Sequence, residues 1–116
     1  MQVTLPWFPK QLSPNARVHW GTKAKFQRIY RTECWAQTRE ALGLVNLRGE
    51  FPVSLTITFV PPSRRQYDLD NCLAAIKSGL DGVADALQVN DHRFKLKPLM
   101  SDDIGGFINI QIEVGP

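Results

Sequence analysis

The chain has few cysteines, few histidines and no long apolar run, and these shortages exclude several classes of protein. Its 116 residues include two cysteines, Cys34 and Cys72, without a CxxC pair or the Cys/His spacing of a zinc site. We therefore expect two buried, reduced thiols in a cytoplasmic protein, not a disulfide or zinc scaffold. The apolar runs fall well short of the roughly 20 residues that a membrane span needs.

Other features are missing as well. The first ten residues, MQVTLPWFPK, have neither a charged n-region nor an apolar h-region, so we expect no signal peptide. The chain also lacks the Gly-rich loop that cradles nucleotide phosphates, and it has no repeat or low-complexity tract. A length of 116 residues with 43% hydrophobic and 22% charged residues suits one globular domain and is too short for two. We therefore expect a single domain over residues 1–116.

The net charge of +3 conceals an uneven distribution. Residues 1–48 carry eight basic and two acidic residues, whereas residues 49–116 carry six basic and nine acidic residues. A basic first part and an acidic second part suit a polyanion that one part binds and the other processes. The alternative is that mixed charges only keep a small domain in solution, and charge alone does not decide between the two.

Hydrophobic periodicity predicts an α+β domain with the element order β-α-β-α-β-β. The expected elements are a strand at 2–7, a helix at 23–43, a strand at 53–59, a helix with an apolar stripe from 73 to 87, a short strand at 94–97 and a strand at 108–114. The second helix is the clearest, because its apolar residues step by three and four. We expect the last two strands to pair as a hairpin and both helices to pack on one side of a small mixed sheet.

Three carboxylates flank this second helix. Asp68 and Asp70 precede it in an Asp-x-Asp-Asn element, and Asp91 follows it. In an extended segment, residues two apart point to the same side, so both of the first two carboxylates can meet one ion. An aspartate at a helix start also serves as an N-cap, but capping does not need all three residues. Carboxylates brought together repel each other, and a divalent cation such as Mg²⁺ is the usual compensation.

Basic residues around these carboxylates point to an anionic substrate, in particular a phosphodiester. Arg64 and Arg65 stand just ahead of the Asp-x-Asp-Asn element and are the strongest candidates. Further DNA-phosphate contacts are expected from Arg17, Lys23, Lys25, Arg28, Arg31, Lys95 and Lys97. Such contacts position DNA without reading its sequence. For each of them the alternative is a solvated charge.

The three tryptophans are expected in the core more than on a base-stacking surface. Trp7, Trp20 and Trp35 are large apolar side chains, and core positions are the common fate of such residues. Trp20 falls in an expected loop, so both interpretations stay open for it.

The motifs together resemble the RusA family of Holliday junction resolvases, small dimeric endonucleases common in bacteria and their prophages. The resemblance covers nearly the whole chain. It is carried by LPWFP near the start, SPNARVHW with the basic helix after it, RRQYDLDN, LDGVADAL and the element around Asp91. The Asp-x-Asp-Asn element with a downstream aspartate is the most specific of these motifs.

The resemblance implies that Asp68, Asp70 and Asp91 bind Mg²⁺ and are required for cleavage. An asparagine precedes Asp91 where many members have a second acidic residue. The family often has a functional lysine four residues after the second aspartate, a position that Ala74 occupies here. Lys77 lies only about 20° from Asp70 around an ideal helix, so we expect it to take the catalytic role. The alternative is that Lys77 flanks the apolar stripe in solvent.

The implied activity is magnesium-dependent, structure-specific hydrolysis of DNA phosphodiesters, with paired cuts that resolve a four-way junction in recombination and repair. A two-fold symmetric junction and one active site per chain imply a homodimer. No small-molecule cofactor is expected. One alternative is a non-catalytic junction-binding or DNA-binding dimer, which the three aspartates disfavour. Another is a magnesium-dependent phosphohydrolase of small nucleotides, which the missing Gly-rich loop disfavours.

Overall fold

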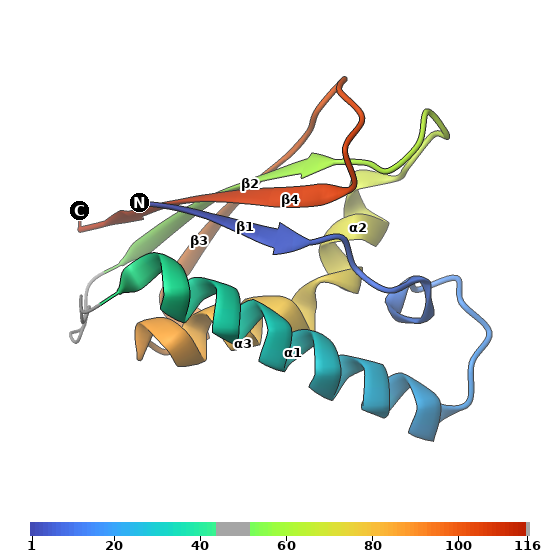
Figure 1. The fold of residues 1–116 in the computed structure, drawn as a ribbon, viewed down its shortest axis with the longest axis horizontal. Helices are drawn as coiled ribbons and strands as arrows, with labels where there is room; N and C mark the ends of the chain where they lie inside the picture. Colours follow the sequence, from blue (N-terminus) through green and yellow to red (C-terminus); the bar gives the residue numbers. More distant parts are fainter. Residues whose placement is uncertain (44–51, 116) are drawn as a thin grey trace.

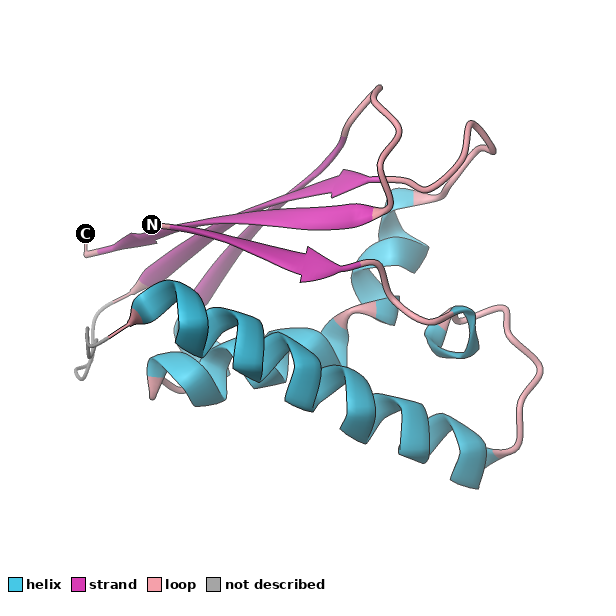
Figure 2. Ribbon diagram, viewed as in Figure 1, coloured by secondary structure: helices cyan, strands magenta, loops and turns pink. Residues whose placement is uncertain are grey.

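A sheet and a layer of helices make up the part of the chain that the computed structural model describes, residues 1–43 and 52–115 (Figures 1 and 2). In chain order the elements are β1 (Gln2–Pro6), the 3₁₀ turn η1 (Lys10–Leu12), α1 (Trp20–Leu42), β2 (Val53–Val60), α2 (Leu69–Ala75), α3 (Lys77–Leu87), the 3₁₀ turn η2 (Asp91–Arg93), β3 (Phe94–Met100) and β4 (Phe107–Val114). The helices cover one face of the sheet, so the predicted α+β class is confirmed.

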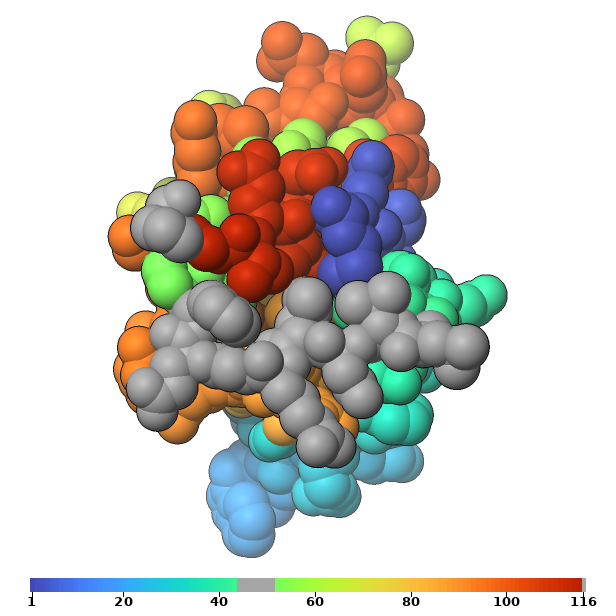
Figure 3. Space-filling model, turned by 90° about the vertical axis from the view of Figure 1, so that its left-hand side faces the viewer, coloured from blue at the N-terminus to red at the C-terminus, as the bar shows by residue number. Residues whose placement is uncertain are grey.

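The sheet is mixed, with the strand order β1-β4-β2-β3. β4 pairs antiparallel with both β1 and β2, and β3 pairs parallel with β2. The pairing of β1 with β4 brings the two ends of the described chain together, as Figures 1 and 3 show. There the amide of Ile112 donates a 2.7 Å hydrogen bond to the carbonyl of Met1.

The predicted hairpin between the last two strands is wrong. The connection after β3 passes over the end of β2, where the amides of Ser101 and Gly106 donate 2.9 Å hydrogen bonds to the carbonyls of Phe59 and Val60. β4 then runs on the other side of β2. In this central position β4 pairs along both edges, with β1 and β2, and its apolar residues Ile108, Ile110 and Ile112 are buried.

The core lies between the sheet and the helices. Its largest fully buried strand residues in β2 and β4 are Val53, Leu55, Ile57, Phe59, Ile108 and Ile110. The alternating polar residues of β2 lie on the open face of the sheet and are partly exposed. Each large side chain buried in this way stabilises the fold by roughly 1.5–3 kcal/mol. Hydrophobic alternation therefore decides which sheet face the helices cover.

α1 and α3 pack closely because α3 presents glycines to α1. A methyl group at Gly79 would lie 2.5 Å from the ring of Tyr30, and one at Gly82 would overlap the carbonyl oxygen of Arg31. Tyr30 and Cys34, four residues apart on α1, are fully buried. The Tyr30 hydroxyl also donates a 2.8 Å hydrogen bond to the carbonyl of Pro6, which joins α1 to β1.

The predicted second helix is two helices, α2 and α3, which meet at Ile76. The predicted stripe is nevertheless inside, since Ile76, Leu80, Val83 and Leu87 are buried and Leu73 packs against the core. Neither proline nor glycine stands at the junction, so the sequence carries no usual signal for the break. The break sets α2 at an angle to α3 (Figure 1).

Three further expectations have structural outcomes. Cys34 and Cys72 are free and buried, as predicted. Trp7 packs edge-on against Phe59 with ring centroids 6.1 Å apart. Trp35 is 44% exposed, so the predicted core position is wrong for it, and Trp20, for which both positions were open, is 79% exposed on the surface. Within the described residues, no helix is both long enough and apolar enough to cross a membrane.

Candidate functional site

Asp70, Lys77 and Asp91 line one cavity of about 380 Å³, which we call the carboxylate cavity. They come from three successive elements, α2, α3 and η2. The rest of its wall consists of Leu73, Ala74, Leu80, Asp81, Phe94 and Leu96. Because β3 pairs parallel with β2, the crossover through α2 and α3 carries the chain from the end of β2 back to Phe94, which pairs with Val53 at the start of β2. The cavity lies along this return path.

The polar residues that were predicted for this cavity are accessible. Asp70, Lys77 and Asp91 are all exposed. Several of the apolar wall residues next to them are wholly or partly buried. Lys77 lies on the Asp70 side, as the helical spacing predicts, although the two residues belong to separate helices. Ala74, which stands where the resemblance would place a functional lysine, lines the same cavity.

Asp81 is a fourth charged residue of the carboxylate cavity, and the sequence analysis missed it. Burial raises the pKa of its carboxyl group, while Arg31 acts to lower this pKa and Asp91 acts to raise it. The available signal was its spacing, because a residue four positions after Lys77 lies on the same helix face. The cavity therefore combines three carboxylates with one lysine.

Asp68 lies apart from this group. Its carboxylate accepts a 3.1 Å hydrogen bond from the amide of Asn71 and caps α2, and it lines a different cavity. Asp70 already lies in the first turn of α2, so the two residues are not consecutive same-side positions of an extended segment. Asp70 and Asp91 thus line the same cavity, whereas Asp68 lines another, so the shared site of the three residues stays a prediction.

The carboxylate cavity has donors suited to a hard cation. Among residues 1–43 and 52–115, no group of three His, Cys, Asp or Glu side chains is placed to hold a metal ion. Mg²⁺ needs fewer protein ligands, since it usually binds through one or two carboxylates and completes its shell with water and substrate phosphate oxygens. Asp70 and Asp91 are the two predicted ligands that share a cavity.

Two predicted DNA-contact residues adjoin this cavity. Arg28 and Arg31 of α1 line a hollow of about 330 Å³ whose wall also includes Lys77 and Asp81. Arg31 is engaged by Asp85, with its Nε and Nη2 atoms 2.8 and 3.0 Å from the two carboxylate oxygens. This hydrogen-bonded pair raises the pKa of Arg31 and offsets its charge. Arg28 is therefore the more available cation of the two.

The other predicted DNA contacts lie elsewhere. Arg64 and Arg65 are exposed in the connection between β2 and α2. Lys95 and Lys97 alternate with Phe94 and Leu96, and since the latter line the carboxylate cavity, both lysines belong to the open face of the sheet.

The remaining three lie just before α1 or in its first part. Arg17 is exposed just before α1, Lys23 lies in its first turn and is partly exposed, and Lys25 is exposed. None of them is part of the wall of the carboxylate cavity. The structure therefore spreads the predicted contacts over more than one surface.

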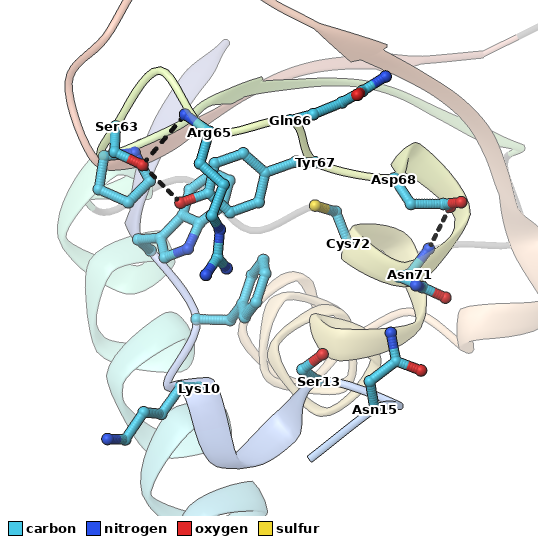
Figure 4. A pocket seen from close by; sticks show the side chains of 13 residues that line it. Lys10, Ser13, Asn15, Ser63, Arg65, Gln66, Tyr67, Asp68, Asn71 and Cys72 are labelled. Carbon is cyan, nitrogen blue, oxygen red and sulfur yellow. Dashed lines mark hydrogen bonds between the residues drawn. The ribbon is translucent and has the colours of Figure 1, made fainter.

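A larger cavity of about 650 Å³ lies beside the start of α2 (Figure 4). We call it the aromatic cavity, because the rings of Trp7, Phe8 and Tyr67 form part of its wall. Asp68 and Arg65 also line it. The sequence analysis assigned no cavity to these aromatic residues.

Comparison with known proteins gives one informative match. No family model matches the chain. An uncharacterized protein of Xylella fastidiosa (strain Temecula1 / ATCC 700964) is 44% identical to it over 104 residues, which cover 88% of this chain and 67% of that protein. Identity of this degree over most of both chains establishes common descent. The chain belongs to the same protein family as this Xylella fastidiosa protein.

Proposed function

We propose that the protein is a magnesium-dependent endonuclease that cuts branched DNA, of the Holliday junction resolvase type that its motifs resemble. The observation that supports this most is the carboxylate cavity, which Asp70, Lys77 and Asp91 all line although they come from three different elements. Acidic residues that repel each other need a cation, and a nearby lysine suits an anionic substrate. The proposal includes a homodimer in the cytoplasm that acts on a four-way junction.

The residues of the cavity divide the chemistry among them. Asp70 and Asp91 would hold the Mg²⁺, which would supply polarisation of a phosphoryl oxygen and a lower pKa of a water ligand. Lys77 stabilises the charge that builds up on the phosphate. Asp81, whose pKa burial raises, adds negative charge that strengthens the attraction for a cation once it is ionised.

Asp68 is the third ligand of the proposal and needs a test of its own. Its carboxylate caps α2 and would have to leave the Asn71 amide to join the ion. Asparagine caps a helix as well as aspartate does but is a poor Mg²⁺ ligand without charge. Asp68→Asn is therefore expected to lose cutting at unchanged stability. Retained cutting would assign Asp68 to the cap alone.

DNA binding in this proposal depends on cations around the cavity. Arg28 adjoins it from α1, and Arg64 and Arg65 stand at the connection that leads into α2. Phosphate contacts of this kind weaken steeply with salt and carry no sequence information. Junction preference must therefore come from shape, or from bases that are already unpaired.

The deciding experiment compares three substrates with and without Mg²⁺. Labelled synthetic four-way junction, linear duplex of the same sequence and free nucleotide are each incubated with the protein. Paired nicks in the junction alone, only with Mg²⁺, support the proposal. A junction that is shifted in a gel but uncut indicates a binding protein, and released phosphate indicates a phosphohydrolase.

Asp70→Asn is expected to abolish cutting and leave junction binding intact or stronger. The substitution removes a metal ligand and one negative charge, and a loss of several kcal/mol of transition-state stabilisation means a rate decrease of about 100-fold or more. Asp102→Asn is the matched control, since it makes the same change in the exposed turn after β3. If Asp70→Asn loses binding together with cutting, the assigned role is wrong.

A further inference from the structure

The aromatic cavity has the lining of a ligand site. Its volume of about 650 Å³ falls in the range of small-molecule sites in proteins, about 300–1,000 Å³. Trp7 stacks on Phe8 with ring centroids 4.7 Å apart, and Tyr67 stands nearly perpendicular to Trp7 at 5.4 Å. Because Phe8 is buried and Trp7 contacts Phe59 of the core, these rings are held in place.

The rings are accessible as well as fixed. Trp7 and Tyr67 are only partly buried, so part of each ring borders the cavity. An aromatic face binds every nucleobase by stacking, largely without regard to its identity. A fixed and accessible aromatic wall is therefore suited to a flat heterocycle.

Polar side chains complete the cavity. The guanidinium of Arg65 lies over the Tyr67 ring, 4.8 Å from its centre, so a base that stacks on this face of the ring takes the place of the guanidinium (Figure 4). Asn15 and Asn71 lie on the opposite side, where their amides can pair with the edge of a base. Lys10 and Arg65 are two cations against the single carboxylate of Asp68, a balance that favours a ligand with a phosphate.

The cavity also stands in a useful place relative to the carboxylate cavity. Asp68 lines the first and Asp70 lines the second. Their α-carbons are two residues apart and therefore separated by at most about 7.6 Å. A DNA strand advances about 3.4 Å per nucleotide along the duplex axis. A strand that crosses the start of α2 thus passes one lining residue of each cavity within a length of about two nucleotides.

We infer that the aromatic cavity takes up one unstacked nucleotide, whose base packs on the aromatic wall next to the phosphate at the carboxylate cavity. This inference rests on the proposed function, since it takes DNA as the ligand. Unstacking costs least for a base that is mismatched or already unpaired. The cavity therefore gives the protein a means of preferring DNA with an exposed base to continuous duplex, which the phosphate contacts lack.

The test measures binding without cutting. Dye-labelled duplexes that contain either one unpaired thymine or an abasic site at the same position are titrated with the protein in EDTA, and anisotropy gives both affinities. We expect the unpaired thymine to bind roughly tenfold more tightly than the abasic site. Tyr67→Ala is expected to bring this ratio close to one, whereas Tyr67→Phe keeps the ring and the ratio.

Arg64→Ala is the matched control. Arg64 lies beside Arg65 but does not line the aromatic cavity. Its loss should therefore weaken the binding of both duplexes equally and leave the ratio of their affinities unchanged. A ratio near one in the wild type overturns the inference, and so does a ratio that Tyr67→Ala leaves unchanged. Displacement of the thymine duplex by micromolar thymidine monophosphate would assign the cavity to free nucleotides and also overturn it.

The binding test of this inference and the cutting test of the proposed function can fail independently of each other. Binding in EDTA does not require Mg²⁺ or an intact carboxylate cavity, so Asp70→Asn should show the same thymine preference as the wild type. A junction that is cut by a protein without this preference refutes only the inference. An uncut junction together with a ten-fold preference refutes only the nuclease.

Discussion

Gly82→Ala is expected to destabilise the protein by separating α1 from α3. The added methyl group would overlap the carbonyl oxygen of Arg31 and lie 3.0 Å from the backbone nitrogen of Trp35. Both atoms belong to the backbone of α1, so no rotation of a side chain relieves the contact. Overpacking an interior costs about 1–3 kcal/mol and occasionally more, while replacing glycine by alanine in a helix returns about 1 kcal/mol. We place the cost of overpacking at Gly82 at about 3 kcal/mol or more. The free energy of unfolding should therefore decrease by about 2 kcal/mol net.

Urea denaturation followed by circular dichroism measures this loss directly. A net decrease of about 2 kcal/mol is a large share of the 5–15 kcal/mol that stabilises a typical domain. Gly21→Ala is the matched control, because its nearest neighbour is the exposed side chain of His19, which can move. We expect that variant to stay within about 1 kcal/mol of the wild type. If Gly82→Ala is as stable as the wild type, the close approach of the two helices has been misjudged.

Three further predictions concern stability, pH and DNA affinity. The hydroxyl oxygen of Ser78 is buried without a hydrogen-bond partner in the described part of the chain, so Ser78→Ala should stabilise the protein by up to about 1 kcal/mol in urea denaturation, and a comparable loss would contradict this. Burial raises the pKa of Cys34 from 9.0 to about 12, so the unfolded state releases this proton first, and the free energy of unfolding should fall as pH rises above about 9, less steeply in Cys34→Ala. Asp85→Asn frees Arg31 from its ion pair and should raise DNA affinity and steepen the dependence of log K on log salt by up to about one unit. An unchanged slope would show that Arg31 does not contact phosphate.

The individual elements of this fold could be predicted because each carries its own periodicity. The alternation in 53–59 indicates β2, and the buried Tyr30 and Cys34 follow from their spacing on α1. Strand pairing is a different matter, because it depends on residues far apart in the chain. The hydrogen bonds that carry 101–106 over the end of β2 are backbone contacts, which leave no mark in the sequence. The predicted hairpin failed for that reason.

The candidate site could be predicted in part for similar reasons. Lys77 was expected on the Asp70 side from helical geometry, and both line the carboxylate cavity. Asp81 escaped notice because a single carboxylate on an amphipathic helix resembles ordinary surface charge, and its burial becomes evident only once η2 and β3 are placed against α3. The sheet face on which Lys95 and Lys97 lie could not be predicted either, because pairing with the partner strand decides which side of an edge strand the helices cover.

The position of Asp68 depends on where α2 begins. With Asp68 as the N-cap, Asp70 is already helical, and the rotation of about 100° per residue turns the two side chains toward different cavities. Had the helix begun two residues later, the same Asp-x-Asp pattern would have been extended and its carboxylates would have pointed to one side. The end of a helix can fray by one or two residues. The geometry that stabilises α2 and the geometry that would complete a three-carboxylate site are thus alternatives for one side chain.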